Sequence, residues 1–217
     1  MLLAIDTATN RLGLAITDGA RILAEETWLS SRHATVELPP EAARLLRRQG
    51  LTERDLSGLA VTIGPGSYTG LRIGLAFAKG LAFARGLKIV GVPTLDVLAS
   101  GQPSRPEPML ALIHAGRGRW SAAWYKWSRK AWKQEGEGLI AETETLESLI
   151  ERPTYVCGEL TAAERKLLGG WRQIRLADPA LCVRRPAVLA SLGWARLRTR
   201  KASDPMALVP IYPGVPS

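Results

Sequence analysis

The sequence predicts an α/β fold with two lobes. Both halves begin with consecutive short apolar runs that can pair as hairpins, and both then alternate strand patterns with helical patterns. A stretch rich in Pro, Ser and Gly, residues 99–108, separates the halves. We therefore expect a first lobe over residues 1–100 and a smaller second lobe over 101–217, whose C-terminal helix, about 186–201, can pack back on the first lobe.

The elements of the first lobe follow from the spacing of its apolar residues. Alternating apolar residues predict three strands at the start, with a hairpin turn at Asp18–Ala20. The next segment is amphipathic at helical spacing, and we expect Pro39 and Pro40 in or near its first turn, where a missing N–H costs little. Gly50 and Gly86 end the two longer helices. The predicted strands are 2–5, 12–17, 21–29, 59–63 and 87–92, and the predicted helices are about 35–49, 69–85 and 93–98.

In the second lobe, apolar runs again predict strands before helices. The last helix has Pro186 at its first position and basic residues near its end, where cations suit the helix dipole. No internal repeat is evident from the residues alone. The predicted strands are 109–115, 119–127, 131–142, 155–157 and 174–176, and the predicted helices are 162–168 and 186–201.

The stretch "IGPGSYTGLRIG", residues 63–74, lies between a predicted strand and a predicted helix, where proteins often bind phosphate. It does not fit the P-loop pattern, because no Lys follows a glycine at the required spacing. It does not fit the dinucleotide fingerprint either, because Thr69 occupies the third glycine position. A general anion site at the helix N-terminus remains open, and Ser67 is predicted to cap this helix rather than to act as a nucleophile.

The helix over 69–85 is apolar on two sides. One stripe is suited to packing on the sheet and consists of Leu71, Leu75, Ala78 and Ala82. The second stripe consists of Ile73, Phe77, Gly80 and Ala84. Small residues such as Gly70 and Gly74 would let another backbone approach closely. We interpret the second stripe as a surface for a partner protein, while burial within the same chain remains the alternative.

The composition is that of an ordinary globular protein with an excess of positive charge. Hydrophobic residues make up 46% and charged residues 23% of the 217 residues, and the net charge is +9. Two distant cysteines indicate no disulfide framework, and we expect a cytoplasmic location. His33 and His114 have no second ligand at metal spacing, so no metal site is predicted, and His33 is expected to be a surface or capping residue rather than a base.

Residues 117–133, "RGRWSAAWYKWSRKAWK", combine aromatic and basic side chains, which together can bind single-stranded nucleic acid. The alternation along this stretch favours a different interpretation, a hairpin with one face in the core. If the chain contacts nucleic acid, the candidate residues are Arg117, Arg119, Lys126 and Arg129.

Four segments together resemble one protein family. They are "LAIDTATNRLGLAITDG" at the start, "GPGSYTGLRIGLAFAKGLA" and "GVPTLDVLA" in the first lobe, and "VPIYPG" near the end. In order and spacing they are similar to TsaB, also called YeaZ, which supports synthesis of threonylcarbamoyladenosine in bacterial tRNA. The likeness covers the first lobe and is looser from about residue 101 onward. It implies an actin-like, Hsp70-like fold of two lobes, each with a mixed sheet and flanking helices.

The resemblance also implies a subunit without catalysis or cofactors of its own. The catalytic relative TsaD carries a metal-binding H-x-x-x-H pair on a helix where this chain has Thr94 and Leu98. Actin-like ATPases bind phosphate with Asp-x-Gly-Thr in the first loop, and here Ala8 replaces that glycine, so any ATP is expected at the interface of the complex. The degenerate phosphate-loop positions are Asp6, Thr7, Thr9, Gly64, Gly66 and Ser67.

By the same resemblance, the chain would dimerise with TsaD through the helices at about 35–49 and 69–85, and would recruit the ATPase TsaE. TsaD would transfer the threonylcarbamoyl group to the adenosine next to the anticodon of tRNAs that read codons starting with A. The chain would contact tRNA indirectly, and would form a homodimer when alone. Alternatives are an actin-like ATPase or kinase and a glycoprotease-like peptidase. The expected partner-binding residues are Leu38, Ala42, Leu45, Leu46, Gly70, Ile73, Gly74, Phe77, Gly80 and Ala84.

Overall fold

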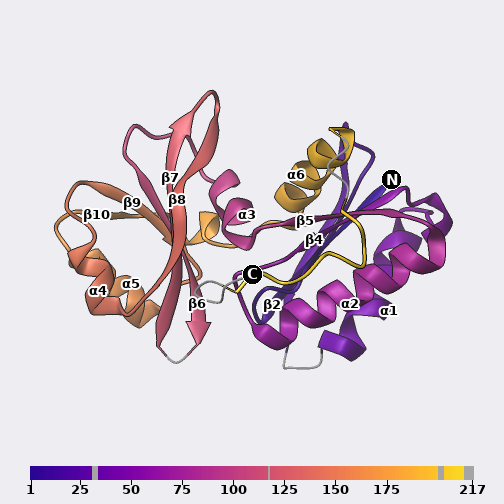
Figure 1. The fold of residues 1–217 in the computed structure, drawn as a ribbon, viewed down its shortest axis with the longest axis horizontal. Coiled ribbons are helices and arrows are strands. Elements are labelled where there is room, and N and C mark those ends of the chain that lie inside the picture. The colour runs from indigo at the N-terminus through magenta and orange to yellow at the C-terminus, as the bar shows by residue number, and fades with distance from the viewer. Residues whose placement is uncertain (31–33, 117, 200–202, 213–217) are drawn as a thin grey trace. The chain divides into compact units, whose positions relative to one another are not determined.

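The computed structural model describes residues 1–30, 34–116, 118–199 and 203–212, which divide into two compact units (Figure 1). The first unit contains Met1–Thr94 and Arg185–Ile211. The second contains Leu95–Arg184 and Tyr212. Both are α/β units with a mixed sheet, so the predicted fold class is confirmed.

A five-stranded mixed sheet forms the centre of the first unit. Its strand order is β3-β2-β1-β4-β5. β1 pairs with β2 and β2 with β3 in antiparallel fashion, whereas β1, β4 and β5 run parallel. The strands are β1 (Leu2–Asp6), β2 (Arg11–Thr17), β3 (Ile22–Leu29), β4 (Gly58–Thr62) and β5 (Lys88–Val92).

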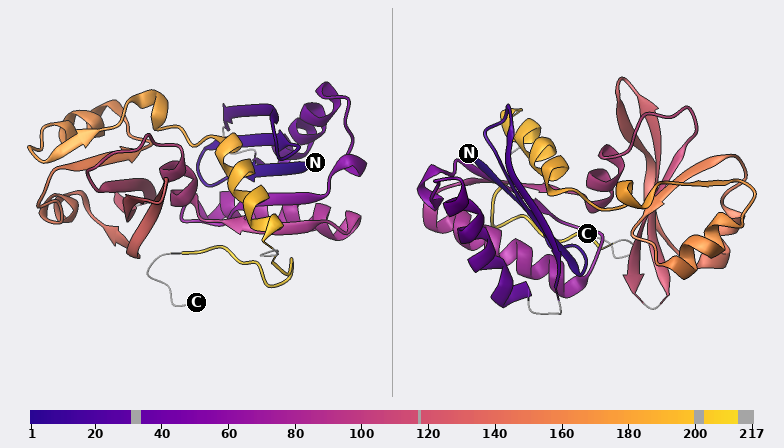
Figure 2. Two further views of the ribbon diagram at one scale, coloured as in Figure 1. Left: turned by 90° about the horizontal axis from the view of Figure 1, so that it is seen from above. Right: turned by 180° about the vertical axis from the view of Figure 1, so that it is seen from behind.

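Helices cover both faces of this sheet. α1 (Ala34–Arg48) and α2 (Tyr68–Arg85) lie on one face, and α6 (Pro186–Arg198) lies on the other (Figures 1 and 2). Because successive side chains of a strand point to opposite faces, alternate residues of the strands meet α1 and α2. The core on that face contains Leu3, Ile5, Leu59 and Val61 of the sheet with Leu38, Leu46, Leu75 and Ala78 of the helices.

α6 packs very closely on its face of the sheet. A Cβ at Gly193 of α6 would lie 2.3 Å from the Cβ of Ala60 in β4. At the start of the helix, Pro186 occupies the space above Gly13 of β2 in the same way, with its Cγ 2.4 Å from where a Cβ would stand. Small residues at these points bring the helix axis close to the sheet.

The second unit repeats the sheet of the first. Its strand order is β10-β9-β6-β7-β8, with antiparallel β6–β7 and β7–β8 pairs and parallel β6–β9 and β9–β10 pairs. The strands are β6 (Met109–Gly116), β7 (Arg119–Ser128), β8 (Ala131–Ala141), β9 (Thr154–Gly158) and β10 (Ile174–Leu176). The other helices are α3 (Thr94–Ser100), α4 (Thr143–Ser148) and α5 (Ala162–Gly169), with short 3-10 helices at Glu53–Asp55 and Pro179–Leu181.

The expected division of the chain at residues 100 and 101 is corrected by where two helices pack. Leu95, Leu98 and Ala99 of α3 join the core of the second sheet, beside Met109 and Tyr125. α6 follows the second sheet in sequence but packs on the first, as the sequence allowed for the C-terminal helix. Each unit therefore contains the helix that follows the other unit's sheet, and the boundaries lie after Thr94 and after Arg184.

Two helices differ from the sequence-based expectations. α1 begins at Ala34, so Pro39 and Pro40 stand in its second turn rather than in its first, where they were expected. Because the two prolines lack N–H groups, the carbonyls of Thr35 and Val36 have no partner one turn along the helix. These two residues and both prolines are exposed, so water can donate hydrogen bonds to the carbonyls. α4 was not predicted, because it is short and carries little apolar periodicity.

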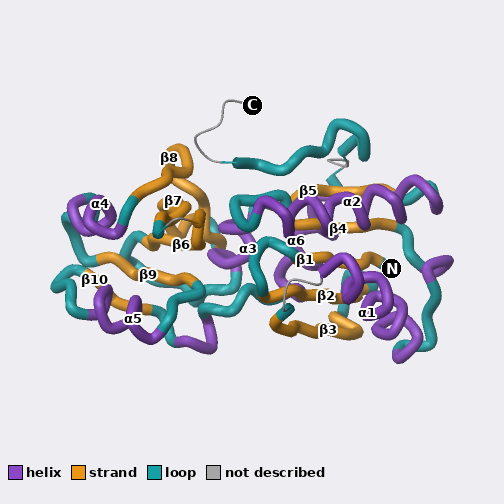
Figure 3. Tube along the Cα trace, turned by 90° about the horizontal axis from the view of Figure 1, so that it is seen from below, coloured by secondary structure: helices purple, strands orange, loops and turns teal. Residues whose placement is uncertain are grey.

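A segment near the C-terminus runs back along the first unit (Figure 3). The N–H of Ser203 donates to the carbonyl of Ile89 at 2.9 Å, and the N–H of Ile211 donates to that of Ile63 at 2.6 Å. Leu208, between these bonds, is buried in the core of the first unit. The described part of this segment, residues 203–212, thus pairs with β5 and with the residue that follows β4.

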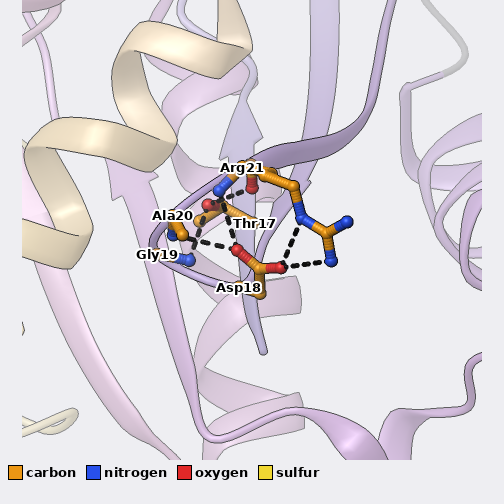
Figure 4. A network of polar contacts seen from close by, with 5 residues as sticks. All are labelled: Thr17, Asp18, Gly19, Ala20 and Arg21. Carbon is orange, nitrogen blue, oxygen red and sulfur yellow. Dashed lines mark hydrogen bonds and ion pairs between the residues drawn. The ribbon is translucent and has the colours of Figure 1, made fainter.

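The turn between β2 and β3 is built around Asp18 (Figure 4). Its carboxylate accepts the N–H groups of Ala20 at 2.9 Å and Arg21 at 2.7 Å, and the Arg21 guanidinium at 3.0 Å. The backbone N–H of Arg21, then that of Ala20, then the Arg21 side chain lower the pKa of Asp18 from 3.8 to about 2. The predicted hairpin turn is confirmed, and the Asp18 side chain stabilises it by accepting backbone N–H groups of the turn.

We predict opposite effects of alanine at two helical glycines. Gly193→Ala should lower the free energy of unfolding by at least about 1 kcal/mol, because the new methyl overlaps Ala60 of a central strand. Gly80→Ala is the matched control, since a Cβ there has nothing within 4 Å, and it should raise stability by about 0.5–1 kcal/mol. Urea denaturation of the two variants measures both changes, and equal effects would contradict the packing described for α6.

We also predict a pH-dependent effect of Asp18→Asn. The lowered pKa means that the Asp18 carboxylate contributes stability that is fully present above pH 3.8 and is lost as the pH falls through about 2. At neutral pH the variant should therefore melt at a lower temperature than the parent protein. The two melting temperatures, followed by circular dichroism, should converge below about pH 2. A difference in melting temperature that stays constant from neutral pH to below about pH 2 would show that the charge of Asp18 does not contribute to stability.

Candidate functional site

The first loop, residues 6–9, packs tightly at the end of β1. Asp6 is 2% exposed, and its Oδ1 accepts the Ala8 N–H at 3.0 Å and the Thr62 hydroxyl at 3.1 Å. The Thr7 hydroxyl donates to the carbonyl of Gly70 at 2.8 Å. The side chain that would face phosphate or magnesium in an actin-like ATPase is thus buried and hydrogen-bonded within the chain.

The first loop packs against residues 63–67, which lie between β4 and α2 and which we call the glycine loop. The Ser67 N–H donates to the Ala8 carbonyl at 2.7 Å, and the Ser67 hydroxyl accepts the N–H of Gly70 and caps α2, as predicted. A Cβ at Gly66 would stand 2.2 Å from the Ala8 oxygen, and a Cβ at Gly70 would stand 2.3 Å from the Thr7 oxygen. The glycines therefore permit close contact between two segments of the chain.

Two further glycines, Gly64 of the loop and Gly74 of α2, make similar contacts. A Cβ at Gly74 would lie 2.1 Å from the Thr7 hydroxyl oxygen. Gly64 has φ +112°, and a Cβ there would lie 2.3 Å from the carbonyl oxygen of Ile211 in the C-terminal segment. The loop therefore joins the first loop, the start of α2 and the C-terminal segment.

A small pocket of about 350 Å³ opens beside the first loop. Thr9 and Asn10 line one side of it, and Ser67, Thr69 and Gly70 line another. Its lining within the described residues includes hydroxyl and amide groups but no charged side chain. Such a lining can donate hydrogen bonds but offers no acid or base for proton transfer.

The positions that correspond to the TsaD histidines are buried. Thr94 is 0% and Leu98 2% exposed, and the Thr94 N–H donates to the Gly64 carbonyl. Asp96, the acid of α3, accepts the phenol of Tyr125 at 2.9 Å. Burial, and then the Asp96 carboxylate, hold the pKa of this phenol far above its ordinary value. Among the described residues, no group of three or more His, Cys, Asp or Glu side chains could hold a metal ion.

The outer side of α2 and the neighbouring part of α1 expose large apolar side chains. Phe83 is 89% and Tyr68 55% exposed, and Val36 of the neighbouring α1 is 73% exposed. The small residues Ala76, Gly80 and Ala84 are exposed on the same helix. We call this set the helix surface; it consists of Thr35, Val36, Pro39, Tyr68, Arg72, Ile73, Ala76, Phe77, Gly80, Phe83 and Ala84.

An apolar groove of about 560 Å³ runs between α1 and α2 on the helix surface. Pro39 and Leu38 line it from α1, and Ile73, Ala76 and Phe77 line it from α2. At one end the Arg72 guanidinium lies over the Tyr68 ring, 4.1 Å from its centroid. A groove of this composition suits apolar side chains of a helix better than a charged ligand.

The expected partner-binding residues fall into two groups in the structure. Six make contacts within the first unit: the four of α1 lie in its core, and Gly70 and Gly74 contact Thr7. The four are Leu38, Ala42, Leu45 and Leu46, all at most 4% exposed in the core of the first unit. Ile73 and Phe77 are half-buried, packing against that core with part of each side chain, while Gly80 and Ala84 are exposed.

Sequence reasoning missed the most exposed apolar side chains. Phe83 stands between the two predicted stripes of α2, in line with Arg72, Ala76 and Gly80 at spacings of three and four. A helical wheel read through positions 72, 76, 80 and 83, rather than through the two apolar stripes alone, would have found it. The burial of that stripe on the sheet is confirmed.

The aromatic and basic stretch forms a hairpin, as its alternation predicts. Trp120, Tyr125 and Trp132 are buried, and β7 pairs with β8 along its length. The candidate nucleic-acid residues do not form one patch: Arg119 begins the ten-residue strand β7, whereas Lys126 and Arg129 lie at its other end. Arg117 and His33 lie outside the described residues. The His114 ring lies against that of Trp120, tilted by 31°, with ring centroids 4.3 Å apart.

Within the described residues, no helix has the length and apolar character needed to cross a bilayer. The longest is α2, with 18 residues, and it carries Arg72, Lys79 and Arg85.

Comparison with known proteins agrees with the resemblance noted above. The family model described as TsaD, tRNA N6-adenosine threonylcarbamoyltransferase, matches residues 27–167. The tRNA threonylcarbamoyladenosine biosynthesis protein TsaB of Bacillus subtilis is 29% identical, with 97% of this chain and 93% of that protein covered. Its namesake from Escherichia coli is 32% identical, with 73% of this chain and 68% of that protein covered.

A solved structure, YeaZ from Pseudomonas aeruginosa, has the same fold. It superposes with a TM-score of 0.78 at 20% identity, and the match covers 97% of this chain and 98% of that one. The family model covers more than half of the chain, and the identity to the Escherichia coli relative extends over most of both proteins. The chain therefore belongs to the TsaB (YeaZ) family, within the wider group that the TsaD family model describes.

Proposed function

We propose that this chain is a noncatalytic subunit in the synthesis of threonylcarbamoyladenosine in tRNA, and that it acts by binding the catalytic subunit TsaD through the helix surface. Membership of the TsaB family supports the pathway, because its curated relatives are named as biosynthesis proteins of this nucleoside. The observation that carries the partner role is the exposed apolar side of α2, on which Phe83 is 89% exposed.

The helix surface has the properties of a helix-packing interface. Phe83, Tyr68 and Val36 supply apolar and aromatic area, which is enriched at the centre of protein interfaces. Gly80 leaves open space where a Cβ would stand, so the backbone of a partner helix can approach α2 closely there. The groove between α1 and α2 can receive the side chains of such a helix. An exposed apolar area of this kind marks an interaction site on a globular protein.

The first loop supports a role without catalysis by this chain. Thr7 and Ala8 fill the space beside the glycine loop, and Asp6 is hydrogen-bonded to Thr62 and Ala8. In this proposal TsaD performs the transfer to the adenosine next to the anticodon. The ATPase TsaE joins the same assembly, and ATP binds at the interface of the complex.

A homodimer through the same surface is part of the proposal when TsaD is absent. A two-fold dimer uses the same patch on both copies, so Phe83 and Gly80 of one copy would meet the same helix of the other. Competition between TsaD and a second copy for one surface then follows, because both would cover α2.

We predict that Gly80→Arg and Phe83→Glu weaken binding to TsaD at least about thirtyfold, the effect of a residue whose loss costs ~2 kcal/mol at an interface. Phe83 is 89% exposed and a Cβ at Gly80 would have nothing within 4 Å, so the isolated variants should keep their fold. Phe77→Glu is a poorer test, because Phe77 also packs against the core. Isothermal titration calorimetry with the cognate TsaD measures the affinity, and thermal melting checks the fold.

Leu167→Glu is the matched control for these variants. Leu167 is an exposed apolar residue, 53% exposed, on α5 of the second unit. It should leave the affinity for TsaD unchanged. Parent-like binding by a folded Phe83→Glu variant, or equal losses in Phe83→Glu and Leu167→Glu, would remove α2 from the interface.

Reconstitution tests the function itself. Transfer of the threonylcarbamoyl group to unmodified tRNA by TsaD and TsaE should require this chain, and the chain alone should not turn over ATP. The Phe83→Glu variant should fail to restore transfer, whereas the Leu167→Glu variant should restore it. Transfer at full rate without the chain would reject the proposal, and magnesium-dependent ATP hydrolysis by the isolated chain would favour an actin-like ATPase.

A further inference from the structure

The turn between β7 and β8 places two cations where glycine is normally found. Arg129 and Lys130 form this two-residue turn, with φ of 51° and 63°. Turns of this kind favour Asn-Gly, because most other side chains are strained at positive φ. Both residues are exposed, so packing does not explain their presence. The chain keeps two long cationic side chains at a position where they destabilise the hairpin.

Two more cations stand beside the turn. Lys126 and Lys133 are directly opposite each other across the β7–β8 pair, and both are exposed. Like charges in opposed positions destabilise a sheet. None of the ion pairs found among the described residues involves these two lysines, Arg129 or Lys130. The hairpin tip, Lys126–Lys133, therefore carries four cations without a carboxylate partner in the described part of the chain.

An aromatic side chain is held at the same tip. Trp127 is 36% exposed and meets the buried Trp132 edge to face, with ring centroids 5.5 Å apart. Trp132 is fixed in turn, because its indole N–H donates to the Gln102 carbonyl at 3.3 Å. Strand alternation puts Trp127 on the other face of the hairpin from Lys126, and the turn residues can be reached from both faces. A single strand that crosses the turn can thus contact cations and the indole together.

We propose that the hairpin tip binds single-stranded RNA, with its four cations on the phosphates and Trp127 against a base. Cations with an exposed aromatic ring suit this ligand, because the cations follow the backbone and any base can stack on the ring. An acidic protein surface would pair with the cations but would not use the exposed part of the Trp127 ring. The net charge of +9 favours a polyanionic partner. This site lies in the second unit and does not depend on the helix surface of the first.

Charge reversal at the lysine pair tests the phosphate contacts. In Lys126→Glu/Lys133→Glu the opposed residues still carry like charges, so the repulsion that destabilises the hairpin is kept. The charge presented to the RNA, however, changes from positive to negative. Binding to a labelled single-stranded RNA and to unmodified tRNA, measured by fluorescence anisotropy, should weaken at least about tenfold. The salt dependence, the slope of log K against log salt, should become shallower by about 1.4, the value for two lost phosphate contacts on a single strand. Trp127→Ala should weaken binding at least about fivefold through lost stacking.

A second variant separates binding from stability. Arg129→Asn/Lys130→Gly installs the residues that this turn prefers, so it should raise the melting temperature and still weaken RNA binding. The matched control is Lys166→Glu/Arg172→Glu, which makes the same change in charge at exposed positions of the second unit. Its effect should stay below about threefold.

Three outcomes would overturn the proposal. The first is that the tip variants and the control variant bind RNA equally well, and the second is that the turn variant is more stable and binds RNA as the parent does. The third is that the tip variants lose binding to TsaD or TsaE but keep RNA binding, which would make the tip a contact for a protein. Because TsaD binding through α2 is measured separately, the failure of either proposal leaves the other standing.

Discussion

The docking of the first loop on the start of α2 is the contact on which the first unit depends. The Ser67 N–H reaches the Ala8 carbonyl at 2.7 Å and the Thr7 hydroxyl reaches the Gly70 carbonyl at 2.8 Å, because no Cβ intervenes at Gly66 or Gly70. These bonds hold the N-terminal end of α2 against the end of β1. The direction of the helix then follows.

The rest of the helix follows from that anchor. With its first turn held, the stripe of Leu71, Leu75, Ala78 and Ala82 lies on the sheet, and Gly86 in the left-handed conformation ends the helix. The opposite side, with Phe83 and Gly80, is left for solvent or a partner. A glycine loop that resembles a phosphate site in sequence thus acts in this chain as the joint that orients a helix.

The sequence predicted most elements but not their distant contacts. Strands, caps and the buried stripe of α2 depend on residues close in sequence, and these were confirmed. The spacing of Gly66, Gly70 and Gly74 indicates close approach, but their contact, Thr7–Ala8, lies about sixty residues earlier. The packing of α3 on the second sheet was missed for the same reason, because amphipathic periodicity shows that a helix packs and leaves open on which sheet; the return of α6 to the first lobe was expected.

The apolar stripe of α1 shows a second limit of prediction from the sequence. Leu38, Ala42, Leu45 and Leu46 have the spacing of an apolar helix face, and this spacing is the same for a core and for a protein interface. α1 and α2 together cover one face of the first sheet, so the stripe of α1 is buried in the core. The part of α1 left for a partner, Val36 and Pro39, is irregular in sequence and gives no periodic signal.

The two candidate surfaces share a physical property: each retains residues that lower the stability of the isolated chain. Gly80 in the middle of an exposed helix costs about 1 kcal/mol relative to alanine, and Phe83 beside it is almost fully hydrated. At the hairpin tip, two cations at positive φ and an opposed lysine pair each destabilise the turn. Neither set of residues is explained by contacts within its own unit. Residues that lower stability and make no contact within the chain indicate contacts with another molecule. The chemistry of the two surfaces differs: the first unit suits an apolar helical partner, and the second suits an anionic strand.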